Sequence, residues 1–420
     1  MFRVVETFSG IGSQAKALKN IKADYEITKT ADWDIGAIIA YYLIHRKNDN
    51  YSAYDNLSDK EIDDFLKRQT LSMDGKTQIA ETYYNQLTDD FKRLLYVAIK
   101  ETNNLVSVTD IKADDIPENT DLLTYSFPCQ DLSLCGCWHG NRSGIARDAH
   151  NRSGMLWEIE RILMEMNETG KELPRFLLME NVPNILSKPH EADFGDWKST
   201  LNSLGYINKI YVLNAQNFGI PQKRERAYMI SIRCSDKEKI RLINEYFEYN
   251  DLEDIVCAIG ASRRRLSLSD ILCLDYSVEK YKSEADESKP NNTPSREKIF
   301  LDNVILYDGK NILETAVTTV TTKQDRNPNS GLITYKNYAR GKTKWRYLTP
   351  RECFKLMGFE EEDFDKVVNE EIYADKGARR TFFNLERLHK LAGNSIVVDV
   401  LEAIFKQILF INTNILGERK

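Results

Sequence analysis

The first half of the chain alternates short apolar runs with longer stretches in which apolar residues recur at helical spacing. Short runs rich in β-branched and aromatic residues are typical of buried strands, and the longer periodic stretches are typical of amphipathic helices. Strands that alternate with helices in this way indicate an α/β fold with a mostly parallel sheet. We predict helices at residues 12–21, 35–45 and 155–166, and strands at residues 2–8, 25–33, 121–127, 175–181, 207–215 and 226–233.

Two regions interrupt this alternation. Residues 46–105 are polar and helix-prone, so we interpret them as a helical insertion packed beside the core. After Cys234 the pattern stops, and residues 235–345 combine an acidic, serine-rich stretch with short β-prone pieces such as TAVTTVTT. This composition predicts a second, smaller and irregular β-containing domain. Helical patterns return at residues 348–359 and 394–409, and we expect the last helix to dock on the first domain.

Length and composition fit a globular protein with one large and one smaller domain. The 420 residues are 42% hydrophobic and 29% charged. The longest apolar runs, such as residues 38–44, fall far short of the roughly 20 residues that a membrane span needs. The N-terminus lacks the pattern of a secretory signal. We therefore expect a cytoplasmic protein with no membrane partner.

The cysteines give a second indication of the compartment. The seven cysteines are odd in number and scattered, which argues against a disulfide framework and favours reducing conditions. Cys135 and Cys137 are spaced like half of a metal site, but we find no second pair of Cys or His residues at ligand spacing. We therefore predict no metal and interpret these two cysteines as loop thiols.

Charge is unevenly distributed along the chain. The formal net charge is −6, which gives no overall signal for nucleic acid binding. Between Lys323 and Arg346, however, the chain carries seven Lys and Arg residues and one Asp. A local basic stripe of this kind suits phosphate binding. An ordinary solvated loop explains it equally well on this feature alone.

A glycine turn lies between the first predicted strand and the first predicted helix. Gly10, Gly12 and Ala15 follow the G-x-G-x-x-A spacing that lets a backbone pass close to a ligand at a helix N-terminus. Asp32 comes about 20 residues later at the end of the second strand, where an acid can hold ribose hydroxyls, and Trp33 beside it could stack on adenine. The pattern predicts a nucleoside-containing ligand, and both NAD and S-adenosylmethionine fit it.

Three further segments stand at predicted strand ends, where α/β proteins carry their chemistry. They contain Cys129 after DLLTYSFP, Glu180 in ENV, and Arg224 with Arg226 in QKRER. A thiolate can attack an electrophile, a glutamate can hold a proton at a ring nitrogen, and arginine can grip a carbonyl oxygen or phosphate. Taken singly, each has an ordinary structural explanation, such as a buried cysteine or a surface ion pair. Their order along one sheet edge favours a functional site.

In this order, FSGIG, PCQ, ENV and QKRER resemble the DNA (cytosine-5) methyltransferases of the bacterial and mollicute type. The segments at residues 152–161, 346–359 and 393–404 match the remaining blocks of that family. The resemblance covers both ends of the chain and leaves out mainly residues 46–105 and 235–345. It implies a Rossmann-like class I S-adenosylmethionine-dependent methyltransferase fold with a smaller target-recognition domain.

The resemblance also implies a division of the chain. Residues 1–233 would form the catalytic and cofactor-binding domain, including the helical insertion. Residues 234–387 would form the target-recognition domain with the TPREC block. Residues 388–420 would provide a C-terminal helix that returns to the catalytic domain.

By the same resemblance, the chain would transfer a methyl group to C5 of a cytosine that is flipped out of duplex DNA. Cys129 would attack C6 and form a covalent intermediate, and Glu180 would hold the N3 and N4 edge of the base. Arg226 would contact the O2 side, with Arg224 in support. The loop after Cys129 contains more residues than shorter family versions, and we expect it to close over DNA.

The remaining residues carried over from the family bind the cofactor or the DNA. The cofactor would be S-adenosylmethionine, with S-adenosylhomocysteine as the product. Asp32 stands where the family often has glutamate. We also expect a third strand to end at Asp110, placing it near the adenine amino group. The predicted cofactor residues are Phe8, Gly10, Ile11, Gly12, Asp32, Trp33, Asp110, Pro128, Leu156, Asn394 and Ser395. The predicted DNA contacts are Gln130, Ser133, Arg152, Thr319, Val320, Lys323 and Arg326.

Alternative functions remain open at this stage. One is an RNA (tRNA) cytosine-5 methyltransferase of the same superfamily, and another is a catalytically silent DNA-binding regulator. The sizeable region between QKRER and TPREC favours readout of double-stranded DNA over RNA. We expect a monomer that associates with the nucleoid through DNA, as a solitary enzyme or beside a restriction endonuclease acting on the same site.

Overall fold

The computed structural model describes residues 1–47, 54, 56–128, 145, 152–324, 330–337, 339–377 and 380–417. The chain divides into two compact units. Unit 1 comprises residues 1–213, 225–261 and 401–420, and unit 2 comprises residues 214–224 and 262–400.

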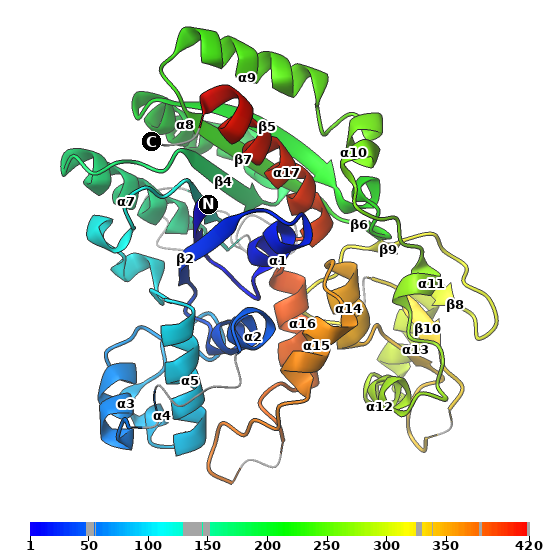
Figure 1. Ribbon diagram of the computed structural model, residues 1–420. Helices are drawn as coiled ribbons and strands as arrows, with labels where there is room; N and C mark the ends of the chain where they lie inside the picture. The colour runs from blue at the N-terminus through cyan, green and yellow to red at the C-terminus, as the bar shows by residue number, and fades with distance from the viewer. Residues whose placement is uncertain are drawn as a thin grey trace. The chain divides into compact units, whose positions relative to one another are not determined.

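Unit 1 is organised around a six-stranded sheet in the order β2-β1-β3-β4-β7-β5 (Figure 1). β1, β2, β3 and β4 pair in parallel, while β7 runs antiparallel to β4. All four residues of β3 are buried, as expected for a central strand covered on both faces. The prediction of a mostly parallel sheet is therefore confirmed. The strands are β1 (Phe2–Thr7), β2 (Tyr25–Ala31), β3 (Leu122–Tyr125), β4 (Phe176–Asn181), β5 (Tyr206–Asn214) and β7 (Glu225–Arg233).

Helices cover this sheet. α7 and α8 contribute the apolar side chains of Leu163 and Trp197 to a core cluster that also contains Tyr125 of β3 and Met179 of β4. The Tyr211 hydroxyl of β5 donates to Gln407 of α17, which attaches the C-terminal helix to unit 1 as expected. The helices are α1 (Ser13–Asn20), α2 (Ile35–His45), α7 (Leu156–Glu168), α8 (Glu191–Ser203), α9 (Lys237–Tyr249), α10 (Ile255–Ala261) and α17 (Val398–Phe410), the last followed by a π-helical turn (Ile411–Leu416).

The predicted helical insertion is present. It forms α3 (Asp59–Leu66), α4 (Glu81–Tyr84) and α5 (Asp89–Glu101). Buried residues on one face of α5 pack against α2 and α3, as its apolar spacing predicts. After α5 the chain returns to the sheet edge, where the Leu105 N–H donates to the Thr30 carbonyl.

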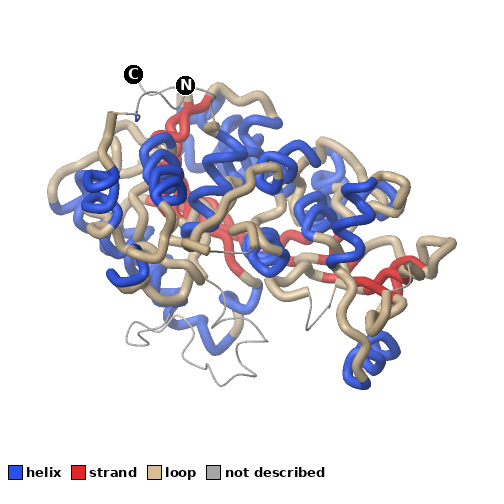
Figure 2. Tube along the Cα trace, turned by 90° about the horizontal axis from the view of Figure 1, so that it is seen from below, coloured by secondary structure: helices blue, strands red, loops and turns tan. Residues whose placement is uncertain are grey.

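Unit 2 is more helical than the sequence predicted. Figure 2 shows where helices, strands and loops lie along the described chain. Its strands are short: β6 (Gln222–Lys223) pairs with β9 (Val317–Thr318), while β8 (Ile305–Tyr307), β10 (Leu332–Thr334) and β11 (Trp345–Arg346) form a second small sheet. The helices are α11 (Leu268–Ile271), α12 (Glu279–Glu287), α13 (Pro294–Asp302), α14 (Pro350–Leu356), α15 (Glu361–Val368) and α16 (Leu385–Asn394).

The acidic, serine-rich stretch is therefore not the irregular segment that its composition suggested. Residues 283–287 form the end of α12, residues 288–293 connect the two helices, and α13 begins at Pro294. At that start the Thr293 hydroxyl accepts the Arg296 N–H, and Pro294 occupies the first turn. Proline and a Thr cap are helix-start signals, which the polar composition masked. Of TAVTTVTT, the pair Val317–Thr318 forms a strand.

The limits of the compact units differ from the predicted limits at residues 233 and 387. α9 and α10, which follow residue 233, pack within unit 1, and residues 388–400 pack within unit 2. The functional division into a catalytic and a recognition domain stays a prediction.

Candidate active site

The glycine turn lies between β1 and α1, where the sequence predicted it. Phe8, Gly10 and Gly12 have φ angles of 54°, 54° and 82°, in the left-handed region, and Gly12 caps α1. A Cβ atom on Gly12 would lie within 3 Å of the rings of His45 and Tyr41, so a side chain cannot be accommodated there. A Cβ on Gly10 would have no other atom of the described chain within 4 Å. The turn therefore leaves open space beside Gly10, as approach of a ligand requires.

Asp32 links this turn to the end of β2. Its Oδ2 accepts the Gly10 N–H at 2.9 Å, and its Oδ1 accepts the Asp34 N–H at 2.9 Å. The carboxylate therefore fixes the glycine turn as well as lying where the sequence placed the ribose acid. Trp33, the next residue, is half-buried.

The end of β3 is anchored to both neighbouring strand ends. The Ser126 hydroxyl donates to the Phe8 carbonyl at 3.3 Å, and the Asn181 amide Nδ2 donates to the Phe127 carbonyl at 3.1 Å. Asn181 is 1% exposed and follows Glu180 directly. The chain immediately before Pro128 is thus held between the glycine turn and the end of β4. The sequence analysis missed Asn181, although a polar residue closing an apolar strand was a signal for it.

Glu180 and Arg226 form an ion pair across the antiparallel strands β4 and β7. Arg226 Nε lies 3.2 Å from Glu180 Oε1, and the two side chains are 14% and 12% exposed. Arg226 also donates to the carbonyl of Glu225 at 2.7 Å. The sequence predicted both residues as site residues, and the structure brings them together in a largely dehydrated position, where charge interactions are stronger than in water.

Glu6 is a buried acid that the sequence analysis did not single out. It lies on β1, one residue before the strand ends, and is 0% exposed. Burial raises the pKa of Glu6 to about 7, although the Tyr41 hydroxyl, the Ala15 N–H and the Arg46 charge lower it in part. A buried carboxyl therefore titrates close to the start of the glycine turn.

Replacing Glu6 with Gln is expected to remove a pH dependence of stability. Folding raises the pKa of Glu6 from 4.5 to about 7. The free energy of unfolding of the wild type therefore decreases by on the order of 3 kcal/mol as pH rises through this window. The Gln variant does not titrate, so its stability relative to wild type should increase from pH 5 to pH 8 in urea unfolding. Glu26→Gln, on β2 with a 43% exposed side chain, is the control. An equal pH response in wild type and Glu6→Gln would contradict this assignment.

The expectation that Asp110 ends a strand is wrong. Residues Val108–Asp110 form a 3-10 helix, and the third strand of the sheet begins only at Leu122. The long insertion before Asp110 led us to place the third strand too early in the chain. The segment after α5 does reach the sheet edge, but it pairs there through an isolated bridge from Asn104 to Thr30 and not as a strand. Asp110 itself is exposed and accepts a hydrogen bond from the Thr109 hydroxyl. Its contact with the cofactor stays a prediction.

The other predicted cofactor residues lie in different settings. Leu156 is fully buried in the core cluster of unit 1, and Ile11 is 1% exposed. Asn394 ends α16 and is exposed, whereas Ser395 is 5% exposed and donates from its hydroxyl to the Leu391 carbonyl. Ser395 and Asn394 belong to unit 2, and the glycine turn belongs to unit 1.

The predicted recognition residues are partly inaccessible. The Val320 side chain is 0% exposed, while the Thr319 hydroxyl donates to the Lys223 carbonyl at 2.9 Å. Lys323 is exposed. Arg224 is 4% exposed and binds main-chain carbonyls within unit 2. Cys129, Gln130, Ser133, Arg326 and the side chain of Arg152 lie outside the described residues.

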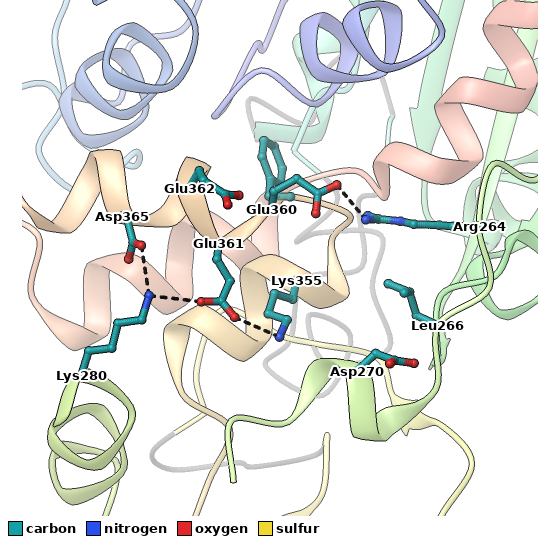
Figure 3. Close-up of a pocket in the computed structure, with 10 residues that line it drawn as sticks. Arg264, Leu266, Asp270, Lys280, Lys355, Glu360, Glu361, Glu362 and Asp365 are labelled. Atoms are coloured by element: carbon teal, nitrogen blue, oxygen red, sulfur yellow. Dashed lines mark hydrogen bonds and ion pairs between the residues drawn. The ribbon is translucent and has the colours of Figure 1, made fainter. Parts of the chain in front are cut away.

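Unit 2 also contains a pocket of about 380 Å³ beside α15 (Figure 3). Lys280 Nζ lies 3.2 Å from carboxylate oxygens of both Glu361 and Asp365, and Lys355 Nζ lies 3.4 Å from Glu361. Because these acids and bases neutralise one another, we interpret the pocket as an ion-pair network that fixes α15.

Among the described residues, no group of three or more His, Cys, Asp or Glu side chains could hold a metal ion. None of the helices in that same part of the chain is long and apolar enough to cross a membrane.

The mostly parallel sheet, with a glycine turn after its first strand, defines a Rossmann-like methyltransferase fold. The crystal structure of the S. pombe Dnmt2 methyltransferase is similar, with a TM-score of 0.55, 17% identity and coverage of 97% of this chain and 98% of that one. At this level of identity the likeness shows the fold alone.

Sequence comparison gives the family. The model of the C-5 cytosine-specific DNA methylase family matches residues 66–409. The orphan methyltransferase M.SssI of Spiroplasma monobiae is 33% identical over 413 residues, which cover 97% of each chain. The type II methyltransferase M2.ScrFI of Lactococcus lactis subsp. cremoris is 32% identical over 413 residues, covering 97% of this chain and 99% of its own. The chain therefore belongs to the C-5 cytosine-specific DNA methylase family and is a DNA (cytosine-5) methyltransferase, which confirms the resemblance found in its sequence.

Proposed function

We propose that the enzyme methylates C5 of a cytosine flipped out of a short specific sequence in double-stranded DNA, with Cys129 as the nucleophile. The observation that carries this proposal is the anchoring of the β3 end. Hydrogen bonds from Ser126 and Asn181 hold the chain just before Pro128–Cys129 between the glycine turn and the end of β4. A nucleophile needs such a rigid base to meet its target atom in the right orientation.

The first step is attack of the Cys129 thiolate on C6 of the cytosine, which forms an S–C6 bond and makes C5 nucleophilic. C5 then forms a bond to the methyl group as S-adenosylhomocysteine is released. The C5 proton passes to a water molecule, and the electron pair left at C5 expels the thiolate from C6 and restores the aromatic ring. Covalent catalysis thereby divides one difficult substitution into easier steps. The base must leave the stack because neither face of C6 is accessible within a duplex, at a cost of a few kcal/mol.

The ion pair of Glu180 and Arg226 would bind the polar edge of the flipped base. Glu180 would hold N3 and N4, and Arg226 would contact O2, stabilising the charge that builds on the ring after attack. Their separation of 3.2 Å and low exposure support this role, because a preorganised, dehydrated pair needs little rearrangement when the base arrives. The pair also keeps Arg226 from being a buried charge without a partner before DNA binds.

The cofactor site would include the glycine turn and the residues that follow β2, together with the other predicted cofactor residues. The open space beside Gly10 leaves room for an adenosine-containing ligand. The turn keeps its shape because Gly12 packs closely against His45 and Tyr41 and because Asp32 accepts the Gly10 N–H. Asp32 would bind the ribose and Trp33 would stack against the adenine, with Phe8 and Ile11 lining the site. S-adenosylmethionine, when bound, supplies an electrophilic methyl group.

DNA sequence would be read by unit 2, with its basic residues on the phosphates and other side chains on base edges. We therefore expect that exchanging residues 262–345 for the corresponding region of a relative changes which sequence is methylated and leaves the reaction unchanged. The exchange begins at residue 262 because α9 and α10 pack in unit 1. Base-resolution mapping of 5-methylcytosine before and after the exchange measures this. An unchanged sequence preference would refute the division of labour.

The experiment that tests the function is expression in a host without cytosine methylation, followed by base-resolution mapping of 5-methylcytosine in its DNA. Methylation at one short sequence is the expected result. An unmethylated genome, from folded protein that binds S-adenosylmethionine, would favour the alternatives of an RNA substrate or a silent regulator, and assay on transfer RNA would separate these two. We further propose that the enzyme acts as a monomer, with any cognate endonuclease recognising the same site without a stable complex.

A further inference from the structure

Two segments of unit 2 with different expected ligands are joined by buried polar contacts. The first is residues 319–322, which we expect near the target base and call the recognition loop. The second is residues 393–395, which we expect near the cofactor and call the cofactor turn. Because all contacts described below lie within unit 2, they belong to one compact body.

Arg224 binds both segments with one guanidinium group. Its NH1 donates to the Val320 carbonyl at 2.9 Å, while its NH2 donates to the Gly393 carbonyl at 3.1 Å and the Ser395 carbonyl at 2.9 Å. The side chain is 4% exposed. The planar fork of arginine suits this arrangement, because it directs several N–H groups at fixed angles, which a lysine ammonium cannot do.

Gln222, on β6 two residues before Arg224, binds the same loop. Its Oε1 accepts the Val320 N–H at 2.9 Å, and its Nε2 donates to the Leu356 carbonyl at 2.8 Å. Gln222 is 0% exposed, so each of these hydrogen bonds is made away from water. Val320 therefore has both of its main-chain polar groups bound by side chains of the QKRER segment.

The third contact is a close approach of the two backbones. A Cβ atom on Gly393 would lie 2.5 to 2.7 Å from backbone atoms of Thr321 and Thr322. Real Cβ atoms do not come so near other atoms, so only glycine allows the cofactor turn to pack directly against the recognition loop. One segment cannot shift without moving the other or breaking the contacts of Arg224.

We propose that Gln222, Arg224 and Gly393 form a clamp that couples DNA binding at the recognition loop to cofactor binding at the cofactor turn. This inference rests on the proposed function and assigns new positioning roles to Gln222 and Gly393. A ligand that orders one segment also orders the other through the clamp, so the second ligand binds an already ordered partner and binds more tightly. Such coupling is reciprocal: each ligand raises the affinity for the other by the same factor.

The test measures the four dissociation constants of the binding cycle. The probes are S-adenosylhomocysteine and a short duplex containing the sequence identified by methylation mapping, each titrated with and without the other. For the wild type we expect each ligand to tighten binding of the other by roughly fivefold or more. We call the ratio of the dissociation constants without and with the other ligand the coupling factor. For Arg224→Lys and Gln222→Met we expect the coupling factor to fall to within about twofold of 1. Glu225→Gln, at an exposed position between the two arginines, should keep the wild-type factor.

The coupling factor separates the clamp from a purely structural role. A variant that has lost its fold would have a lower unfolding temperature and would bind each ligand more weakly even when the other is absent. A variant that has lost only the clamp would have a lower coupling factor, while its affinity for S-adenosylhomocysteine in the absence of DNA stays within about threefold of wild type. If Arg224→Lys does not fold, Gln222→Met decides. An unchanged factor in a folded variant, or a factor of 1 in a wild type that methylates DNA, overturns the clamp alone. A wild type that neither binds nor methylates the duplex overturns the proposed function and the clamp together.

Discussion

Replacing Cys129 with alanine is expected to lower methyl transfer by roughly 10⁴-fold or more, because in the proposed mechanism the bond from its thiolate to C6 is what activates C5. Cofactor binding should stay close to wild type, since the glycine turn is fixed by Asp32 and by the geometry of Gly12, which the substitution leaves unchanged. Transfer of labelled methyl groups to duplex DNA measures the first effect, and calorimetric titration with S-adenosylmethionine measures the second.

The other cysteines provide matched controls for this substitution. Cys234→Ala and Cys257→Ala remove partly exposed thiols that we assign no role in the reaction, and we expect nearly wild-type activity from both. A Cys129→Ala variant that retains substantial methyl transfer would contradict the nucleophile. Loss of activity together with cofactor binding would instead indicate damage to the fold.

Replacing Glu352 with glutamine is expected to destabilise unit 2 by about 3–5 kcal/mol, the cost of breaking a buried ion pair on one side. Arg346 and Glu352 are both 0% exposed, and each Glu352 oxygen accepts one N–H of Arg346 at 2.8 Å. Glu352 also accepts the backbone N–H groups of Thr349 and Cys273. Glutamine would leave the Arg346 charge buried without a counterion and place an N–H group against other donors.

Thermal or urea unfolding at pH 7 measures this effect, with Glu362→Gln, exposed on α15 in the same unit, as the control. Burial alone would raise the pKa of Glu352, but Arg346 and the two backbone N–H groups outweigh it and hold the pKa below its ordinary value. The pair therefore stabilises the wild type above the ordinary glutamate pKa of 4.5 and loses this effect as pH falls through the lower, folded value. Equal unfolding midpoints for wild type and Glu352→Gln at pH 7 would contradict the assignment.

Local signals explain what could be predicted from the sequence. α2 was predicted with the limits Ile35–His45 that the structure has, because an apolar stretch follows Asp34, whose side chain caps the helix through the Gly36 N–H. The position of Glu180 at the end of β4 and that of Arg226 at the start of β7 were found in the same way, from apolar runs bounded by charged residues. The fold class and the glycine turn follow from patterns that span only a few residues each, whereas the order of the strands in the sheet was not predicted.

Contacts between distant segments explain what was missed. Gln222 is 134 residues from Leu356, and nothing near QKRER in the chain indicates that partner. Asn181 likewise acts on a carbonyl 54 residues away. Asp110 was misplaced because a helical insertion separates it from β2, and periodicity cannot tell a 3-10 helix at a sheet edge from a strand end. Tertiary hydrogen bonds of single polar side chains leave no periodic trace in a sequence.

The contacts of Gln222, Arg224 and Gly393 have a consequence for how specificity can change. All three grip main-chain atoms of the recognition loop: the N–H and carbonyl of Val320, and the backbone of Thr321 and Thr322. Because these contacts involve main-chain atoms, they do not depend on most of the side chains in the loop. If the loop reads DNA as we propose, substitutions in its side chains would change the modified sequence while the loop keeps its position, and new targets would arise by point mutation without changes in the catalytic half.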